Sequence, residues 1–515
     1  MSERPTVAII GAGFSGVLTA LRLLLTPDGP KVRLIERAER FGRGAAYATS
    51  NPQHLLNVRA TNMSAFVEQP AHFVDWLRHA GVPTEGQVFV TRDRYGQYLQ
   101  SILRRAAADG GAAGRLTLEH DEVVAAAPDQ AGWALRLAMG RVLSADAVIL
   151  AIGNLPPQPP TGLDPAVAAS ERYAADPWAW DPAAMPPGER VLLLGSGLTA
   201  VDMAVSISEA RPMARVLAVS RHGLLPRRHA MTGQASVPEV RPQGSPVQIL
   251  RAVRAAAEAD WRATIDGLRP LIQSLWRAWD VDEKRRFLRH LRPYWDVHRH
   301  RLAPQMADRL DALRESGRFG CEAGRVRSFA AARDGIEVVW TPRAGDARLQ
   351  RFDMIVNCVG PREDLTHCND PLIASLRGAG LIGPDPCGLG LDVDSRSRVI
   401  AGDGAVSDTL FAVGPITRGE FYEITSVPDI RIQAADCAGT VINTLAARDH
   451  GPPAGTGESR LSAELSAYLQ ETIAELDVEL GSLKFSRRVR NAWELRGQRA
   501  ALDRVSLWLE NRSGG

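Results

Sequence analysis

A glycine-rich turn near the start of the chain constrains the fold more than any other feature. Thr6 to Ile10 is a short apolar run that predicts a buried strand of a parallel sheet. The sequence GAGFSG follows directly, from Gly11 to Gly16, and an amphipathic stretch then predicts a helix. In such a unit the first glycine permits a tight turn and the second lets a pyrophosphate approach the backbone. The third lets helix and strand pack closely.

An acidic residue completes this pattern. The next apolar run, VRLIER, predicts a second strand that ends near Glu36. A carboxylate there accepts hydrogen bonds from a ribose 2′-hydroxyl and repels a 2′-phosphate, while the helix N-terminus offers unpaired N–H groups to a diphosphate. A glycine-rich turn without a ligand is the alternative, but the acid at this distance favours a dinucleotide-binding unit. The predicted cofactor-binding residues are Gly11, Gly13, Phe14, Ser15, Gly16 and Glu36.

The same pattern recurs further along the chain. Arg190 to Leu194 predicts a strand, the sequence GSGLTA follows, and a helical stretch leads to another strand, RVLAVS. That strand is followed by Arg221 instead of an acid. A guanidinium there can grip a 2′-phosphate, which favours NADPH, with NADH as the alternative coenzyme and a solvated loop arginine as the alternative role. The predicted cofactor-binding residues are Gly195, Ser196, Gly197, Leu198, Thr199 and Arg221.

Two such units in one chain, with the acid-ended one first, predict FAD in the first and a nicotinamide coenzyme in the second. The predicted fold class is α/β, with two Rossmann-like dinucleotide-binding domains of the two-dinucleotide flavoprotein type, a helical insertion and a helical C-terminal tail. Two apolar segments, ADAVILAIGN and FDMIVNCVGP, contain Gly153 and Gly360 near their ends. We expect them to be strand-plus-glycine crossovers between the domains, although each alone is equally consistent with a plain buried strand.

The domain organisation follows from these elements. The predicted FAD-binding domain is discontinuous and comprises residues 1–160 and 366–440. The predicted NAD(P)-binding domain comprises residues 161–365, with a helical insertion at about 244–315 that we expect to shape a substrate pocket. Residues 441–515 form a predicted helical C-terminal extension after a Gly- and Pro-rich break. Its leucines at helical spacing predict packing on the body or on another subunit, which leaves a homo-oligomer open.

Composition excludes several classes of partner. Lys and Arg total 61 against 59 Asp and Glu, so the net charge of +2 gives no reason to expect nucleic acid or an anionic membrane. No apolar run reaches the roughly 18–20 residues that cross a bilayer. The five cysteines are scattered, and the N-terminus does not resemble a secretory signal, so we expect a cytoplasmic protein.

The segment WDVHRHRLAP raises the question of a metal site. His298 and His300 are two residues apart, and side chains at that spacing diverge on a helix. The sequence offers no further ligand at metal spacing, so no metal is predicted. A helix that carries Arg299 and Arg301 toward a phosphate or an acidic substrate is a more plausible function than a metal site. Structural packing of Trp295 and Tyr294 is the outcome that we most expect.

Longer motifs reveal a resemblance to a known family. They are AAYATSNPQHLLNVRATNMSAF (45–66), SRHGLLPRRH (220–229), RHLRPYWDVHRHRLAP (289–304) and LFAVGPITRGEFYEITSVPDIRIQ (410–433). With the two glycine turns, and to roughly residue 440, the chain resembles bacterial FAD/NAD(P)-binding proteins related to the class B flavin monooxygenases, which include lysine and ornithine N-hydroxylases. The resemblance implies that His54, Asn57, Met63 and Ser64 lie near the flavin, and that Gly414 and Pro415 belong to the segment covering its ribityl and pyrimidine end.

The resemblance also implies an activity. NAD(P)H would reduce FAD, and the reduced flavin would activate O2 to hydroxylate a small-molecule substrate. The substrate-recognition residues of the lysine and ornithine enzymes do not map onto this sequence, so the catalytic residues stay unassigned. The alternatives are a non-oxygenating flavin reductase or oxidase and a flavin-binding redox sensor without substantial turnover. A disulfide reductase is disfavoured, since no cysteine pair follows the first turn and Cys358 stands alone in an apolar run.

Overall fold

The computed structural model describes residues 4–49, 51–84, 88–108, 114–130, 132–230, 242–366 and 368–450 of the chain. The chain divides into two compact parts, which are Met1–Pro238 with Pro242–Ala438, and Glu239–Arg241 with Gly439–Gly515. Both glycine turns belong to the larger part. Within it, the first unit is the half built on the first large sheet, and the second unit is the half built on the second large sheet. The leucine stripe predicted for the C-terminal extension lies outside the described residues.

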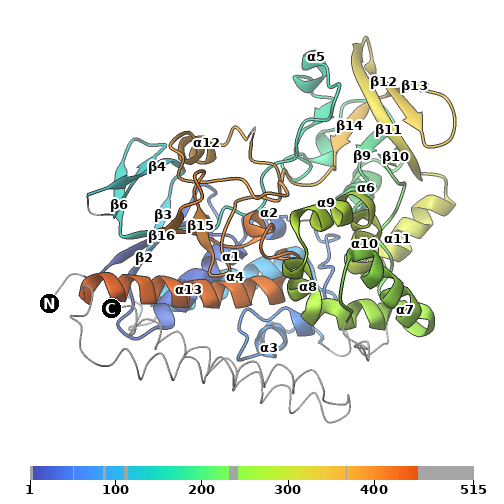
Figure 1. The fold of residues 1–515 in the computed structure, drawn as a ribbon. Coiled ribbons are helices and arrows are strands. Elements are labelled where there is room, and N and C mark those ends of the chain that lie inside the picture. Colours follow the sequence, from blue (N-terminus) through green and yellow to red (C-terminus); the bar gives the residue numbers. More distant parts are fainter. Residues whose placement is uncertain are drawn as a thin grey trace. The chain divides into compact units, whose positions relative to one another are not determined.

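The first large sheet contains the strands β2, β3, β15 and β16 on the left of Figure 1, and the N-terminal strand β1 lies near the middle of its strand order. Its six strands run in the order β15-β16-β7-β1-β2-β3, and neighbours are parallel except for β15 and β16. Strands β15 and β16 come from late in the sequence, so the first large sheet is built from two separate stretches of the chain. The strands are β1 (Thr6–Ile10), β2 (Lys31–Glu36), β3 (Leu116–His120), β7 (Ala147–Leu150), β15 (Arg398–Ile400) and β16 (Val406–Ala412).

A small antiparallel sheet is inserted between β3 and β7. Its strands run in the order β4-β5-β6. Trp133 of β5 is buried, and its indole N–H donates a 3.0 Å hydrogen bond to the hydroxyl of Thr409 on β16, which ties the small sheet to the first. The strands are β4 (Val123–Asp129), β5 (Gly132–Leu137) and β6 (Val142–Ala145).

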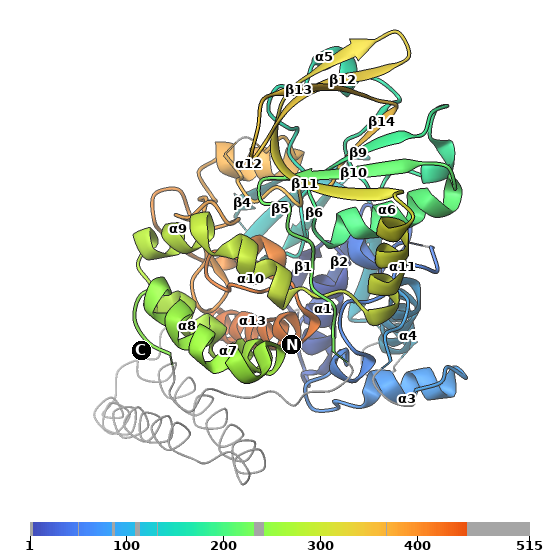
Figure 2. The ribbon, with the colours of Figure 1, turned by 90° about the vertical axis from the view of Figure 1, so that its right-hand side faces the viewer.

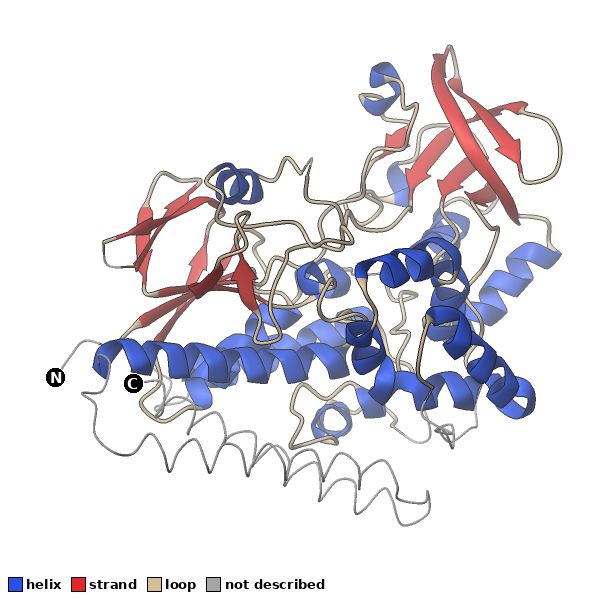
Figure 3. Ribbon diagram, in the orientation of Figure 1, coloured by secondary structure: helices blue, strands red, loops and turns tan. Residues whose placement is uncertain are grey.

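The second large sheet combines a parallel part with an antiparallel extension. Its order is β13-β12-β11-β10-β9-β14-β8, and β11, β12 and β13 form the antiparallel end. The first and second large sheets are separate groups of strands in Figure 3. The strands are β8 (Tyr173–Ala174), β9 (Arg190–Leu194), β10 (Arg215–Ser220), β11 (Phe319–Ala332), β12 (Gly335–Pro342), β13 (Arg348–Phe352) and β14 (Met354–Asn357).

The core of the second half lies on both faces of its sheet. Successive side chains of a strand point to opposite faces, so the run RVLLL of β9 contributes to two hydrophobic clusters. Val191 and Leu193 belong to a cluster that includes residues of α6 and α11, while Leu192 and Leu194 belong to one with Trp340. This is why an uninterrupted apolar run, and not an alternating one, marks the central strand.

Helices cover the sheets and build the insertion. The insertion helices α7 to α10 lie close together in Figure 2 and share a cluster of buried aromatic residues, among them Trp276, Trp279 and Phe287. The helices are α1 (Phe14–Leu25), α2 (Gly44–Tyr47), α3 (His72–His79), α4 (Arg92–Ala108), α5 (Pro165–Ala168), α6 (Leu198–Ala210), α7 (Pro246–Leu268), α8 (Ile272–Ala278), α9 (Val281–His290), α10 (Arg292–Arg299), α11 (Pro304–Glu315), α12 (Pro371–Gly378) and α13 (Val427–His450), with short 3-10 turns at Ala60–Asn62, Pro182–Ala184, Arg269–Leu271 and Pro415–Thr417.

The insertion packs on the segment that follows β16. The indole N–H of Trp276 donates to the carbonyl of Gly419 at 2.7 Å, and its ring stacks on Tyr422 with centroids 4.4 Å apart. A capping box of Ser245 and Gln248 begins α7. Among the described residues, no helix is both long and apolar enough to cross a membrane. The predicted α/β class with two parallel-sheet units is confirmed.

Candidate nucleotide-binding sites

The turn between β1 and α1 requires glycine at two positions. Gly11 has a φ of +101°, and a Cβ atom there would overlap the carbonyl oxygen of Ala151. A Cβ atom on Gly16 would overlap the carbonyl oxygen of Gly11 itself. The Gly11 amide donates a 2.8 Å hydrogen bond to the carbonyl of Ile35 on β2. The first and third glycines therefore hold the N-terminus of α1 close to the sheet.

The middle glycine of this turn has a different environment. Gly13 is the N-cap of α1, and its φ of −72° and ψ of −165° are accessible to any residue. A Cβ atom there would lie 3.5 Å from the Cα atom of Gly44, an ordinary contact. Glycine is not needed here for folding, and the space beside the first N–H groups of the helix suits a diphosphate.

The turn between β9 and α6 repeats this geometry. Gly195 has a φ of +106°, its amide donates to the carbonyl of Val219 at 2.8 Å, and a Cβ atom would overlap the carbonyl oxygen of Cys358. Gly197 is the N-cap of α6 with a φ of −77° and a ψ of −169°, and a Cβ atom there would meet nothing within 4 Å. Ala200, at the third position, is fully buried. The two turns are thus structural copies, each with an open middle glycine.

The two predicted crossovers also occupy equivalent places. β7 pairs with β1 in the first sheet, and β14 pairs with β9 in the second. Gly153 follows β7 with a φ of +70°, and Gly360 follows β14 with a φ of +94°. A Cβ atom on either would meet nothing within 4 Å. Both glycines therefore permit a left-handed backbone beside open space at the carboxyl edge of a sheet.

The acid at the end of β2 contacts the first turn. One oxygen of the Glu36 carboxylate accepts a 2.7 Å hydrogen bond from the amide of Ala12, and the other accepts from the amide of Ala38 at 3.0 Å. These bonds fix the carboxylate beside the glycine turn. A ribose contact of Glu36 remains a prediction.

Comparisons with known proteins identify the first unit. Residues 8–155 match a family model described as FAD-NAD(P)-binding. These residues form an FAD-NAD(P)-binding domain. They include the first glycine turn, Glu36 and the crossover at Gly153, so the predicted resemblance to FAD/NAD(P)-binding proteins is confirmed.

A curated relative matches part of the chain. The L-aspartate N-monooxygenase (nitrosuccinate-forming) of Streptomyces cremeus is 28% identical over 245 residues. The match covers 39% of this chain and 37% of that protein, so the chain spans less than two thirds of the relative's length.

Solved structures show the fold of nearly the whole chain. The ornithine hydroxylase of Pseudomonas aeruginosa matches 86% of this chain and 99% of its own with a TM-score of 0.58 and 15% identity. The ornithine N-hydroxylase of Kutzneria sp. 744 has a TM-score of 0.57 at 15% identity, covering 87% of this chain and 100% of its own. The L-lysine 6-monooxygenase of Pseudomonas syringae has a TM-score of 0.56 at 15% identity, covering 86% and 100%. At these identities the likeness establishes the fold alone.

In the FAD-NAD(P)-binding domain, the segment predicted to lie along the flavin contacts the second unit. His54 is buried, and its two ring nitrogens lie 2.8 Å from the hydroxyls of Thr49 and of Ser206 on α6. Burial, and then the nearby charge of Arg92, lower the pKa of His54 to about 4. The carbonyl of Asn57 accepts a 2.9 Å hydrogen bond from His229. His54 and Asn57 therefore connect the two units.

The remaining residues of that segment are buried. Met63 is 2% exposed and Ser64 is fully buried. The Ser64 hydroxyl donates to the carbonyl of Gln69 at 2.6 Å, and its carbonyl accepts from Arg431 on α13 at 2.9 Å. Flavin contacts of these two residues remain predictions.

The segment of residues 410–433, called the closing segment below, contacts the first glycine turn directly. Phe14 and Ser15, the first residues of α1, are both buried, and a Cβ atom on Gly414 would overlap the Ser15 hydroxyl. Gly414 has a φ of +82°, and its amide donates to the side chain of Gln433 at 2.8 Å. Pro415 then begins a 3-10 turn. The structure thus joins sequence positions that are 400 residues apart at the start of α1.

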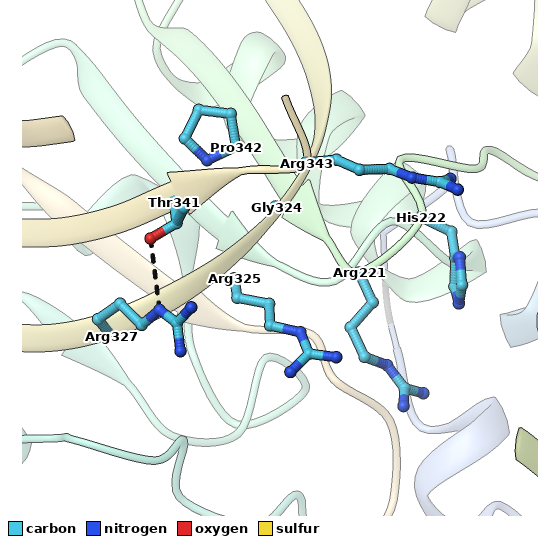
Figure 4. Close-up of a pocket in the computed structure, with 8 residues that line it drawn as sticks. All are labelled: Arg221, His222, Gly324, Arg325, Arg327, Thr341, Pro342 and Arg343. Atoms are coloured by element: carbon cyan, nitrogen blue, oxygen red, sulfur yellow. Dashed lines mark hydrogen bonds between the residues drawn. The ribbon is translucent and has the colours of Figure 1, made fainter. Parts of the chain in front are cut away.

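In the second unit, the predicted cofactor-binding residues lie in three different environments. The Ser196 hydroxyl is used internally, with the hydroxyl of Ser220 at 2.8 Å and the carbonyl of Leu224 at 2.6 Å. Leu198 and Thr199 form the first turn of α6 next to open Gly197. Arg221 is exposed at the end of β10 and lines an open hollow with three further arginines (Figure 4).

A buried ion pair between the units was not predicted from the sequence. Arg92 of α4 donates to the carboxylate of Asp202 on α6 at 2.6 Å, with side chains 15% and 5% exposed. Burial raises the pKa of Asp202, and the Arg92 guanidinium opposes that shift. The guanidinium also lies 5.1 Å from the ring of Trp178. The sequence GSGLTAVD contains the aspartate, but nothing local marks its partner.

One cluster has ligand types that metals use. Ligand atoms of Asp296, His300 and Glu423 all lie within 4.8 Å of one another. However, Glu423 accepts a 2.7 Å hydrogen bond from Trp295, and Arg299 lies 3.3 Å from its second oxygen. These cationic and donor groups, with His300 beside them, hold the pKa of Glu423 well below its usual range despite its burial. Glu423 is therefore already paired with a cation, and Asp296 lies 3.5 Å from Arg292. The cluster joins α10 and the residue that follows it to the closing segment.

Proposed function

We propose that this protein is an FAD- and NAD(P)H-dependent monooxygenase that hydroxylates a small-molecule amine. The observation that carries the proposal is the pair of matching turns, each with an open middle glycine before a helix N-terminus. Both turns lie in one compact part of the chain and could hold two dinucleotides. The FAD-NAD(P)-binding domain supports FAD and a nicotinamide coenzyme as that pair. When bound, FAD accepts a hydride from NAD(P)H and passes electrons to O2.

The chain's own groups supply binding and positioning. The N–H groups at the start of α1 would receive the FAD diphosphate, and those at the start of α6 would receive the coenzyme diphosphate. Glu36 would accept the adenosine ribose hydroxyls of FAD. The buried Arg92–Asp202 pair and the His54–Ser206 hydrogen bond fix the first unit against α6, which would set the distance between the two cofactors.

The proposed domains follow the same division. Residues 1–160 and 366–440 would hold FAD, and residues 161–365 would hold the coenzyme, with the insertion at about 244–315 shaping the substrate pocket. In support, β15 and β16 join the first sheet, and α7 to α11 lie between Pro246 and Glu315. All five cysteines are free thiols, which suits a reducing cytoplasm.

The amine substrate is suggested by the relatives. The curated relative acts on L-aspartate, and the similar folds belong to ornithine and lysine hydroxylases. A disulfide reductase is a poorer candidate, since Cys358 is 4% exposed and burial raises the pKa of its thiol well above the usual range. Its backbone carbonyl faces Gly195, which gives it a packing role.

The test is coupled turnover in air. The FAD-loaded protein is mixed with NADPH and with aspartate, ornithine, lysine and other amines, and coenzyme consumption, hydroxylated product and hydrogen peroxide are measured together. A monooxygenase yields product in proportion to coenzyme with at least one amine. Stoichiometric peroxide with every amine would favour an oxidase, and no consumption with any of them would favour a redox sensor.

A further inference from the structure

An open hollow of about 340 Å³ lies at the carboxyl edge of the second sheet. It is lined by Arg221, His222, Gly324, Arg325, Arg327, Thr341, Pro342 and Arg343. In Figure 4 the side chains of Arg221, Arg325 and Arg327 extend to the same side of the strands, and Arg343 extends toward His222. Four arginines therefore line one hollow.

The antiparallel extension of the sheet brings these arginines together. β10 pairs with β11 as far as Ser220 opposite Ala323, and β11 then continues past the end of its neighbour. Arg325 and Arg327 are both exposed residues of β11. A bulge interrupts the register at Arg327, and the two side chains extend to the same side of the strand in Figure 4. The amide of Arg343, at the end of β12, donates to the carbonyl of Ala323 at 2.8 Å. Ligands of open α/β sheets bind at this edge.

The charges of the hollow are not compensated within the part of the chain that the structure describes. There, none of the four guanidiniums forms an ion pair with a carboxylate, and Arg327 donates only to the Thr341 hydroxyl, at 3.3 Å. By contrast, Arg348 on the same sheet pairs with Glu322. Burial, followed by the charges of Arg221, Arg343 and Arg325, lowers the pKa of His222. Because these like charges repel one another, binding of a multiply charged anion in the hollow would relieve the repulsion.

The two nucleotide units differ at the corresponding position. The first ends its second strand in Glu36, whose carboxylate would repel a phosphate on the ribose. The second ends in Arg221 beside three further arginines. A 2′-phosphate carries about −1.5 to −2 charges near neutral pH and accepts several charge-assisted hydrogen bonds. The same strand end thus excludes that group in one unit and attracts it in the other.

We propose that this hollow binds the 2′-phosphate of NADPH, and that Arg325, Arg327 and Arg343 determine coenzyme specificity together with Arg221. The inference rests on the proposed function, because it assumes that the second unit takes a nicotinamide coenzyme. It adds that most of the phosphate site comes from the β11–β12 hairpin, more than 100 residues from the glycine turn.

The test compares ligands that differ only in the 2′-phosphate. Binding of 2′,5′-ADP, 5′-AMP and inorganic phosphate to the FAD-loaded full chain is measured by titration calorimetry at low and high salt. The variants are R325Q, R327Q, R343Q and the triple variant. The control is R333Q, in the turn at the other end of the same hairpin, about 25 Å from Arg325 along the strand.

Each single variant is expected to weaken 2′,5′-ADP about tenfold and the triple variant more than a hundredfold. Binding of 5′-AMP and of every ligand to R333Q should stay unchanged. The inference is overturned if the triple variant loses less than twofold, if 5′-AMP weakens equally, or if inorganic phosphate binds as tightly as 2′,5′-ADP, which would indicate an adventitious anion site only.

Flavin reduction by NADPH and NADH separates this inference from the proposed function. Arginine-dependent binding of 2′,5′-ADP without reduction by either coenzyme would refute the proposed function and leave the phosphate site standing. Equal reduction by both coenzymes in the wild-type protein and in the triple variant would refute the phosphate site and leave the function standing.

Discussion

Replacement of Gly13 by leucine tests the first cofactor site without disturbing the fold. Gly13 is the glycine of its turn with an ordinary extended backbone and no crowded neighbour. A leucine side chain there would enter the space beside the N-terminus of α1, where we place the FAD diphosphate. The matched control is Gly16→Leu, because a Cβ atom at that position would overlap the Gly11 carbonyl.

The two substitutions are expected to lower stability for different reasons, Gly16→Leu by destabilising the fold and Gly13→Leu by preventing cofactor binding. At Gly13 the nearest atom to a Cβ would be 3.5 Å away, so the apoprotein should lose no more than about 0.5 kcal/mol of folding stability. At Gly16 the helix must move, which costs about 1–3 kcal/mol or more. A bound cofactor at 1,000 times its Kd adds about 4 kcal/mol to the folded state. Gly13→Leu should lose that stabilisation and little else.

The assay measures the flavin-to-protein absorbance ratio and the Tm of each purified protein. Gly13→Leu should be colourless, with a Tm equal to that of wild-type protein stripped of its flavin. Gly16→Leu should unfold below both. Full flavin content in Gly13→Leu would refute the assignment of the diphosphate to this turn.

Three other predictions follow from the second unit and its contacts. Gly197→Leu should retain flavin but lose reduction by NADPH in stopped-flow absorbance. The leucine side chain would fill the open space at the N-cap of α6, where we place the coenzyme diphosphate; reduction at the wild-type rate would contradict that placement. Arg92→Ala should lower the free energy of unfolding by about 3–5 kcal/mol in urea titrations, since it leaves buried Asp202 unpaired. The loss should shrink as pH falls and Asp202 takes a proton, while exposed Arg104→Ala should change stability by less than about 0.5 kcal/mol. His54 has a folded-state pKa of about 4, below its unfolded value, so the stability it contributes is present above pH 6.5 and is lost toward pH 4. His54→Gln should flatten that part of the pH profile, and an unchanged profile would place the acid sensitivity elsewhere.

The sequence predicts the nucleotide units well because their geometry is local. A strand, a glycine turn and a helix are consecutive, and the overlap that forces glycine at Gly11 and Gly195 arises at the turn itself. The crossover glycines follow apolar runs for the same reason. The two units therefore appear in the sequence as two similar patterns.

The sequence predicts less where strand register joins distant residues. Arg325 and Arg327 lie over 100 positions from Arg221, and only the pairing of β11 with β10 places them at one edge. The sequence RVR at 325–327, with two arginines two positions apart, was the signal that could have indicated arginines on one side of a strand. The Arg92–Asp202 pair joins the first residue of α4 to α6, and nothing in the local sequence marks the two residues as partners.

The most direct test of the central claim is anaerobic mixing of the yellow protein with NADPH and, separately, with NADH, while the flavin band is followed in time. Two cofactor sites in one unit predict rapid bleaching by NADPH and slower bleaching by NADH. Flavin that remains oxidised with both coenzymes, in the presence and absence of amines, would contradict the account.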